Sequence, residues 1–139
     1  MKNEKSLIHL TQYYETDQMN VIHHANYVKW MEEARTNFFK EIGIDLSIFD
    51  KKKVSLAVLF QSVNYQKYVK FNERIEIKCR CVELSNIKIK FEYDFFNLNQ
   101  NCICAKGTTN HCFVNDKMEP VILKKKLPAI YELIKKCTL

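Results

Sequence analysis

One long amphipathic helix, preceded by one strand-like segment and followed by several, constrains the fold of this chain more than any other feature. Its apolar residues recur at the spacing of a single helix face: Tyr27, Trp30, Met31, Ala34, Phe38 and Ile42. The short side chain of Asn26 is of the type that accepts hydrogen bonds from the free amides of a first turn, and glycine commonly follows a helix end. We therefore predict a helix with Asn26 as its N-cap and a left-handed Gly43 at its end.

The segments after this helix carry the two-residue period of β-strands. Apolar and charged residues alternate over 74–81 and again over 88–95, which places one face of each strand on the core and the other in water. Residues 54–65 are apolar almost throughout, as in a strand that is covered on both faces. Further strands are predicted at residues 6–14 and 102–115.

The order of strand, long helix and antiparallel strands predicts an α+β fold. A length of 139 residues fits a single domain that spans 1–139. One helix cannot cover both faces of a sheet this large, so either the sheet curls around the helix or a second subunit covers the rest. No segment approaches the ~20 apolar residues of a membrane span, and the N-terminus lacks the apolar region of a secretory leader. We expect a cytoplasmic protein.

The net charge and the cysteines limit which ligands, metals and partners the chain is expected to bind. The net charge is +6, and lysines form short runs at 51–53 and 124–126, which we interpret as solvated loops. A basic surface attracts phosphate-bearing small molecules as readily as nucleic acid, and no pattern of interleaved aromatic and basic residues favours a nucleic acid partner. The cysteines form two C-x-C pairs in predicted strands and no C-x-x-C. We predict buried, reduced thiols, with no metal and no cofactor.

The loop before the helix holds the residues best suited to chemistry. Asp17 lies seven residues before His24, just upstream of the predicted N-cap. A helix N-terminus presents unpaired amides and a positive dipole end that can hold a developing oxyanion, while an upstream carboxylate reaches the same space. Together they supply the two parts that acyl transfer needs. The alternative is structural, with a turn at Thr16-Asp17 and an exposed pair at His23-His24.

The same stretch resembles a known family signature. Its residues are Tyr13, Glu15, Thr16, Asp17, Val21, His24, Ala25, Asn26 and Tyr27, followed by Glu32, Ala34, Arg35 and Thr36. This pattern is similar to that of the hotdog-fold acyl-CoA thioesterases, above all the branch of 4-hydroxybenzoyl-CoA thioesterase and the YbgC-like enzymes. The resemblance implies an antiparallel sheet wrapped around one central helix, in a homodimer or homotetramer with its sites at a subunit interface.

The resemblance also implies residue roles in the hydrolysis of an acyl-CoA, or of an acyl-carrier thioester. Asp17 corresponds to the catalytic carboxylate, acting as nucleophile or as general base on water. His24 corresponds to the residue whose backbone amide polarises the thioester carbonyl, and Tyr13 to a tyrosine of the active-site region. The predicted substrate contacts are His23, Asn26 and Tyr27.

Three positions depart from the family pattern. Asn20 stands where glycine is usual, and asparagine tolerates a left-handed backbone better than most residues. His23 replaces a frequent aromatic residue of the pocket wall, which leaves the acyl preference open. Tyr68-Val69 replaces a common proline-alanine pair.

Two other functions stay open on the sequence alone. A hotdog dehydratase or hydratase pairs a histidine with an acid on the helix, as His24 and Glu32 would here, and a non-catalytic dimer would bind an acyl carrier. Glu32 and Arg35, three residues apart, are interpreted as a surface ion pair of the helix. His9 and His111 are interpreted as packing or surface residues.

Overall fold

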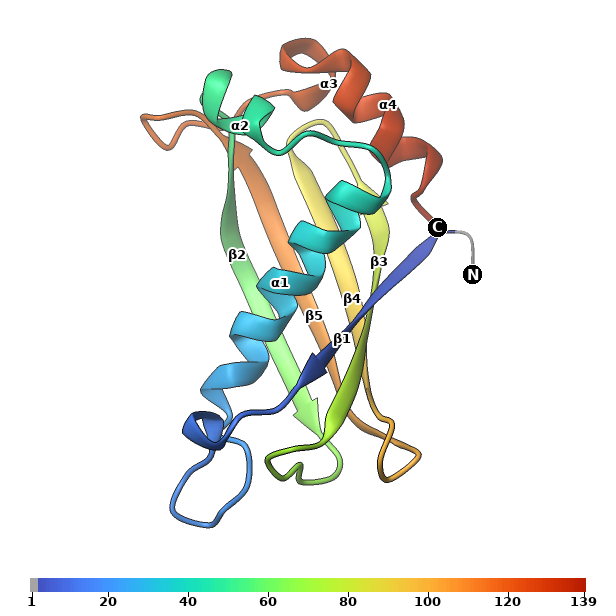
Figure 1. Cartoon of the computed structure of the whole chain (residues 1–139). Helices are drawn as coiled ribbons and strands as arrows, with labels where there is room; N and C mark the ends of the chain where they lie inside the picture. The colour runs from blue at the N-terminus through green and yellow to red at the C-terminus, as the bar shows by residue number, and fades with distance from the viewer. Residues whose placement is uncertain (1–2) are drawn as a thin grey trace.

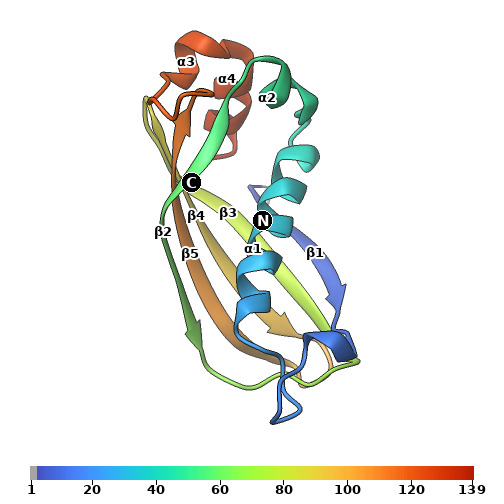
Figure 2. The same cartoon turned by 90° about the vertical axis from the view of Figure 1, so that its left-hand side faces the viewer.

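The computed structural model describes residues 3–139 and shows one antiparallel sheet curled around a long helix (Figure 1). The strands are β1 (Glu4–Leu10), β2 (Ser55–Tyr65), β3 (Arg74–Leu84), β4 (Lys88–Asn97) and β5 (Cys102–Val114). They are ordered β1-β3-β4-β5-β2, and every neighbouring pair is antiparallel. The helix lies on the concave face of the sheet (Figure 2). The predicted α+β class, with a sheet wrapped around one helix, is confirmed.

The central helix, α1 (Ala25–Glu41), presents its apolar stripe to the sheet. Trp30, Met31 and Phe38 are at most 2 % exposed, as the 3.6-residue period predicts. The predicted N-cap is wrong, because the helix begins two residues earlier, with His24 as its N-cap, and takes Asn26 into its first turn. At the other end Gly43 has a φ of +95°, the left-handed conformation that the sequence predicted.

The alternation in β3 and β4 sorts their side chains between core and solvent as predicted. Ile75, Ile77, Cys79 and Cys81 of β3 are all at most 1 % exposed. Burial raises the pKa of the Cys81 thiol to about 11 and that of Cys104 to about 12, so these thiols stay protonated and unreactive at neutral pH. All six cysteines are free, in agreement with the prediction of reduced thiols.

Strand β2 differs from the prediction. Its apolar sequence predicted cover on both faces, but it forms an edge of the sheet, and Val58, Leu59 and Phe60 are 53–54 % exposed. The run that reads as buried therefore lacks a partner within the chain. An exposed apolar edge strand has unpaired backbone groups and can pair with a strand of another chain.

Three short helices close one end of the barrel-like sheet: α2 (Ser47–Lys51), α3 (Leu123–Lys126) and α4 (Pro128–Lys136). They lie at the end opposite the loop that follows the 3-10 turn η1 (Tyr13–Glu15) (Figure 1). The lysine run 124–126 forms α3, so its assignment to a loop is wrong. Within residues 3–139, no helix combines the length and apolarity needed to cross a membrane.

A buried polar chain runs from α1 through the sheet. Arg35 donates to the hydroxyl of Tyr93 (3.3 Å) instead of pairing with Glu32. That hydroxyl shares a hydrogen bond with Thr109 (2.6 Å), and Thr109 shares one with Nε2 of His111 (2.8 Å). His111 is fully buried, as the packing interpretation requires. Burial and the charge of Arg35 lower the pKa of His111 to about 4.

This buried histidine predicts acid sensitivity. The unfolded chain takes up a proton near the ordinary histidine pKa of 6.5, whereas the folded chain does so only near 4, so the stability difference is complete above pH 6.5 and is lost as the pH falls toward 4. Relative to His111→Gln, the wild type should lose roughly 2 kcal/mol of unfolding free energy between pH 7 and pH 4.5. Urea unfolding of both proteins at the two pH values measures this, and parallel losses would contradict it.

Candidate functional site

The loop that carries Asp17 is a small, tightly bonded hairpin. Thr16 and Ile22 form an antiparallel bridge, and the Asp17 amide donates to the Val21 carbonyl at 2.9 Å. Asn20 has a φ of +61°, the left-handed conformation that asparagine tolerates better than most residues. The Ile22 amide donates to Val69 (2.7 Å), which fixes the hairpin to the loop after β2. The Asp17 carboxylate is held by one hydrogen bond, from the Met19 amide at 2.8 Å.

The start of α1 leaves one backbone donor unused. The amide of His23 donates to the Glu15 carbonyl (2.8 Å), and that of Ala25 donates to the ring nitrogen Nδ1 of His23 (3.1 Å). The Asn26 amide donates to the His23 carbonyl. Among residues 3–139, nothing accepts a hydrogen bond from the amide of His24. This donor lies at the positive end of a helix of 17 residues, where an acceptor that gains negative charge is stabilised.

Asp17 and His24 line the same cleft, of about 320 Å³. Its first wall is the hairpin with the helix start, and its second is the segment that leaves β2: Tyr65, Gln66, Lys67, Tyr68 and Val69. Tyr27 closes the cleft from within the core, where it is 3 % exposed and in ring contact with Tyr65 at 5.1 Å. Burial raises the pKa of Tyr27, so its hydroxyl remains a neutral hydrogen-bonding group at physiological pH.

The structure separates the remaining predicted residues from this cleft. Tyr13 lies in a neighbouring cleft of about 340 Å³ with Thr16, Asn20 and Phe71, and its ring packs on Phe71 at 5.6 Å. The Asn26 side chain donates to the carbonyls of Glu15 (2.8 Å) and His23 (3.2 Å), so it holds the backbone.

The side chain of His23 also makes its contacts with neighbouring residues of the chain. Its ring stacks on that of His24 with centroids 4.2 Å apart, and its Nδ1 accepts the Ala25 amide. Of the six predicted site residues, the cleft therefore brings together Asp17, His24 and Tyr27.

A buried carboxylate beneath the hairpin belongs to a residue of the family signature, Glu15, for which the sequence predicted no role. Glu15 is 6 % exposed, and its side chain is bonded to Nε2 of His9 (2.9 and 3.1 Å) and accepts from Nε1 of Trp30 (2.9 Å) and from the Gln12 amide (2.8 Å). Burial by itself would raise the pKa of the Glu15 carboxyl, but the hydrogen bonds from these three donors bring it below its ordinary value. Glu15 is therefore an ionised anchor between β1, η1 and α1.

One of the contacts of Glu15 could have been predicted from the sequence. Gln12 and Glu15 have the three-residue spacing of a capping box, and the structure forms one around η1. The contacts with His9 and Trp30 have no such signal, because they join residues from a strand and a helix. His9 is therefore a packing residue that is hydrogen-bonded to Glu15.

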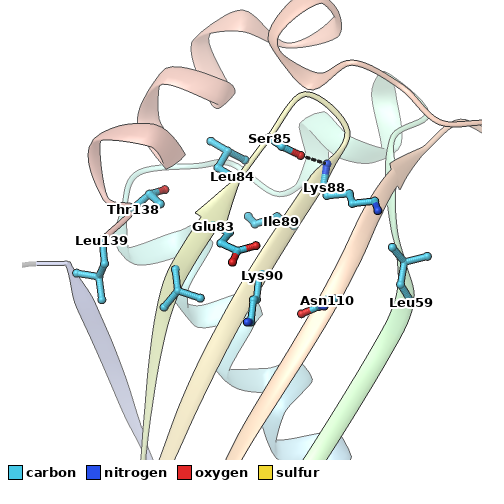
Figure 3. Close-up of a pocket in the computed structure, with 11 residues that line it drawn as sticks. Leu59, Glu83, Leu84, Ser85, Lys88, Ile89, Lys90, Asn110, Thr138 and Leu139 are labelled. Carbon is cyan, nitrogen blue, oxygen red and sulfur yellow. Dashed lines mark hydrogen bonds between the residues drawn. The ribbon is translucent and has the colours of Figure 1, made fainter.

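Other clefts lie apart from Asp17. The largest, about 500 Å³, opens on the face of the sheet away from α1, where Leu59, Lys90 and Asn110 project from neighbouring strands beside the C-terminal Leu139 (Figure 3). It has no carboxylate facing a helix N-terminus. Glu32 lines a further cleft with Arg35, between α1 and the start of β2, and not the cleft of His24.

Comparison with known proteins matches residues 11–130 to the family model described as the thioesterase-like superfamily. The chain is 30% identical over 129 residues to a putative acyl-CoA thioesterase, YneP, of Bacillus subtilis, covering 90% of this chain and 93% of that one. It is 24% identical over 126 residues to the acyl-CoA thioesterase YbgC of Haemophilus influenzae, covering 88% and 91%. A DHNA-CoA thioesterase structure from Staphylococcus aureus superposes with a TM-score of 0.91 at 26% identity, covering 96% and 89%.

The Glu15 anchor predicts a specific cost for losing its charge. Glu15→Gln keeps the shape but removes the negative charge that accepts hydrogen bonds from His9, Trp30 and Gln12, and we expect the unfolding free energy to fall by roughly 1–3 kcal/mol. Urea unfolding measures this. Glu33→Gln makes the same chemical change at an exposed position of α1 and should stay within ~0.5 kcal/mol of wild type. Equal stability of the two variants would show that the buried contacts are not what holds the hairpin.

Proposed function

Because the chain belongs to the thioesterase-like superfamily, we propose that it hydrolyses an acyl-CoA thioester to the free acid and CoA, with Asp17 as the reacting carboxylate. One observation carries the proposal. Asp17 and His24 line a single cleft, and the amide of His24 has no acceptor within residues 3–139, which supports an acid and an electrophilic donor at one place. Relatives named as acyl-CoA thioesterases support CoA as the carrier of the acyl group.

The proposed reaction uses these two groups in sequence. The thioester carbonyl oxygen accepts a hydrogen bond from the His24 amide, and the dipole of α1 stabilises the negative charge that develops there. As general base, Asp17 takes a proton from water while the water oxygen bonds to the carbonyl carbon. The tetrahedral intermediate then collapses, the carbon–sulfur bond breaks, and the proton passes to the CoA thiolate.

Asp17 can also act as nucleophile at the same position. Its carboxylate oxygen then bonds to the carbonyl carbon and expels the thiolate, which leaves a mixed anhydride that water hydrolyses in a second step. Both routes need the same carboxylate and the same amide. The dehydratase alternative receives no such support, since His24 and Glu32 line different clefts.

A homodimer built on β2 completes this proposal. The half-exposed run Val58, Leu59 and Phe60 occupies the free edge of the sheet, and its burial against a second copy removes both the apolar surface and the unpaired backbone groups from water. The other edge is less suited, because β1 is shorter and carries Glu4, Lys5 and His9. The wall of the Asp17 cleft continues directly from β2, so this interface lies beside the site.

Asp17→Asn tests the assignment of the carboxylate. Asparagine keeps the shape and can still accept from the Met19 amide, but it cannot serve as base or nucleophile, so kcat/KM should fall at least ~10²-fold. Release of free CoA thiol from a panel of acyl-CoAs measures the rate.

Asp45→Asn is the matched control for this change. Asp45 is exposed and accepts from the amide two residues on (3.0 Å), as Asp17 does, but it lies outside the cleft. Its variant should retain wild-type rates. Hydrolysis that survives Asp17→Asn unchanged would remove Asp17 from the mechanism, and hydration of an enoyl-CoA without thiol release would favour the dehydratase.

Phe60→Lys tests the dimer. A lysine in the middle of the proposed interface would meet its own symmetry copy, so the variant should elute and scatter light as a monomer, with reduced hydrolysis. Ile8→Lys places the same charge at an equally exposed position on β1 and should leave the oligomer intact. A wild type that is monomeric at micromolar concentration would refute the dimer.

A further inference from the structure

Two lysine runs that are far apart in the sequence meet at one end of the molecule. Lys51 ends α2, Lys52 follows it, and residues 124–126 form α3. Lys52 and Lys126 line one cleft of about 410 Å³, whose other walls are apolar, including Ile48, Leu127 and Ile130. We call this the lysine cleft. Cations at the rim of an apolar cleft suit a ligand with a flat apolar body and anionic groups.

Within one chain the lysine cleft is far from the reaction centre. Its lining residues come from α2, α3 and α4 and the segments beside them, whereas the Asp17 cleft is lined by Tyr65 at the far end of β2. Figure 1 shows these three helices at one end of the molecule and the end of β2 that leads away from them at the other. The 11 residues of β2 place about 35 Å between these ends. A substrate in the Asp17 cleft therefore does not meet the lysines of its own chain.

The proposed dimer changes this relation. A two-fold axis that joins two copies of one edge strand makes them antiparallel. Val58–Phe60 lies near the middle of β2, so facing these runs, with Leu59 opposite Leu59, brings Ser55 of one chain opposite the partner's Val63. Lys52 precedes Ser55 by three residues and stands about 10 Å beyond that point along the sheet. The lysine cleft of one subunit then adjoins the mouth of the partner's Asp17 cleft, where Lys67 adds a further cation.

We propose that the lysine cleft of each subunit binds the nucleotide end of the CoA thioester that is hydrolysed in the partner's Asp17 cleft. Lys52 and Lys126 hold the phosphates, and the apolar lining receives the adenine ring. This assignment rests on the proposed function and dimer. Bound phosphates would offset the repulsion among the lysines that meet there. Without an anionic ligand, lysines from two chains at one mouth would repel one another.

The double variant Lys52→Gln/Lys126→Gln tests the assignment. Loss of two charge-assisted contacts to phosphate should raise KM for acyl-CoA roughly tenfold to a hundredfold and leave kcat near the wild-type value. The same acyl group on N-acetylcysteamine has no nucleotide, so its kcat/KM should not change. Lys135→Gln/Lys136→Gln alters the net charge equally on α4, outside the cleft lining, and should behave as wild type.

Mixed dimers test the crossing between subunits. Pairing an Asp17→Asn subunit with a Lys52→Gln/Lys126→Gln subunit leaves one site with an intact carboxylate and the partner's intact lysines. The hybrid should therefore recover the wild-type KM at about half the wild-type kcat. A KM that stays raised would overturn the crossed arrangement.

A binding measurement separates this inference from the proposed function. Titration calorimetry with 3′-phosphoadenosine 5′-diphosphate needs no turnover, and the double lysine variant should bind it at least tenfold more weakly than wild type. Equal binding, or an equal loss of rate on both substrates, would overturn the lysine cleft while hydrolysis by Asp17 stands. Hydrolysis restricted to a protein-bound acyl carrier, with no nucleotide binding, would overturn it as well.

Discussion

The buried carboxylate of Glu15 ties together the segments whose relative placement makes the site. Its side chain bonds to His9 of β1 and to Trp30 of α1, and its backbone carbonyl accepts the amide of His23. A carboxylate that is 6 % exposed is tolerated only because donors surround it. The hairpin with Asp17 begins directly after this anchor, and the free amide of His24 directly follows the amide that the anchor holds. The hairpin with Asp17 and the helix end cannot separate without breaking charge-assisted hydrogen bonds, which is the fixed geometry that the proposed electrostatic catalysis requires.

The sequence predicted most of the fold, because the strongest features were periodic. The stripe of α1 and the alternation of β3 and β4 each follow from a fixed repeat, and these elements were placed within a few residues. The residue-level errors arose where tertiary contacts decide. Asn26 has the side chain of an N-cap, but the carbonyls of Glu15 and His23 draw it into the first turn instead. For the site, the resemblance predicted Asp17 and His24, which line one cleft, and it contained Glu15 without predicting its contacts, because two of its partners come from distant elements.

The sequence predicted that β2 is covered on both faces, and the exposure of this strand bears on the proposed dimer. A nearly continuous apolar run normally indicates burial on both faces, yet the chain folds with this run at an open edge. In the proposed dimer, a second subunit would supply the cover that the apolar run of β2 predicts. The loop after β2 forms a wall of the Asp17 cleft, so a partner on this edge would also contact the proposed site. The proposed assembly and the proposed catalysis would then be coupled through one strand.

The distribution of positive charge follows from the chemistry of such a substrate. Lys67 lines the Asp17 cleft, and in the proposed arrangement the other cations that serve the phosphates lie farther from the thioester, where they stabilise the Asp17 carboxylate less and leave it a stronger base. CoA carries its phosphates at the end of a long arm, which sets the separation that these cations need. Within one chain the lysine cleft lies at the far end of β2 from the Asp17 cleft. In the proposed dimer, an antiparallel second copy would bring lysines to that distance without any additional sequence, because each chain's far end would become its partner's near end.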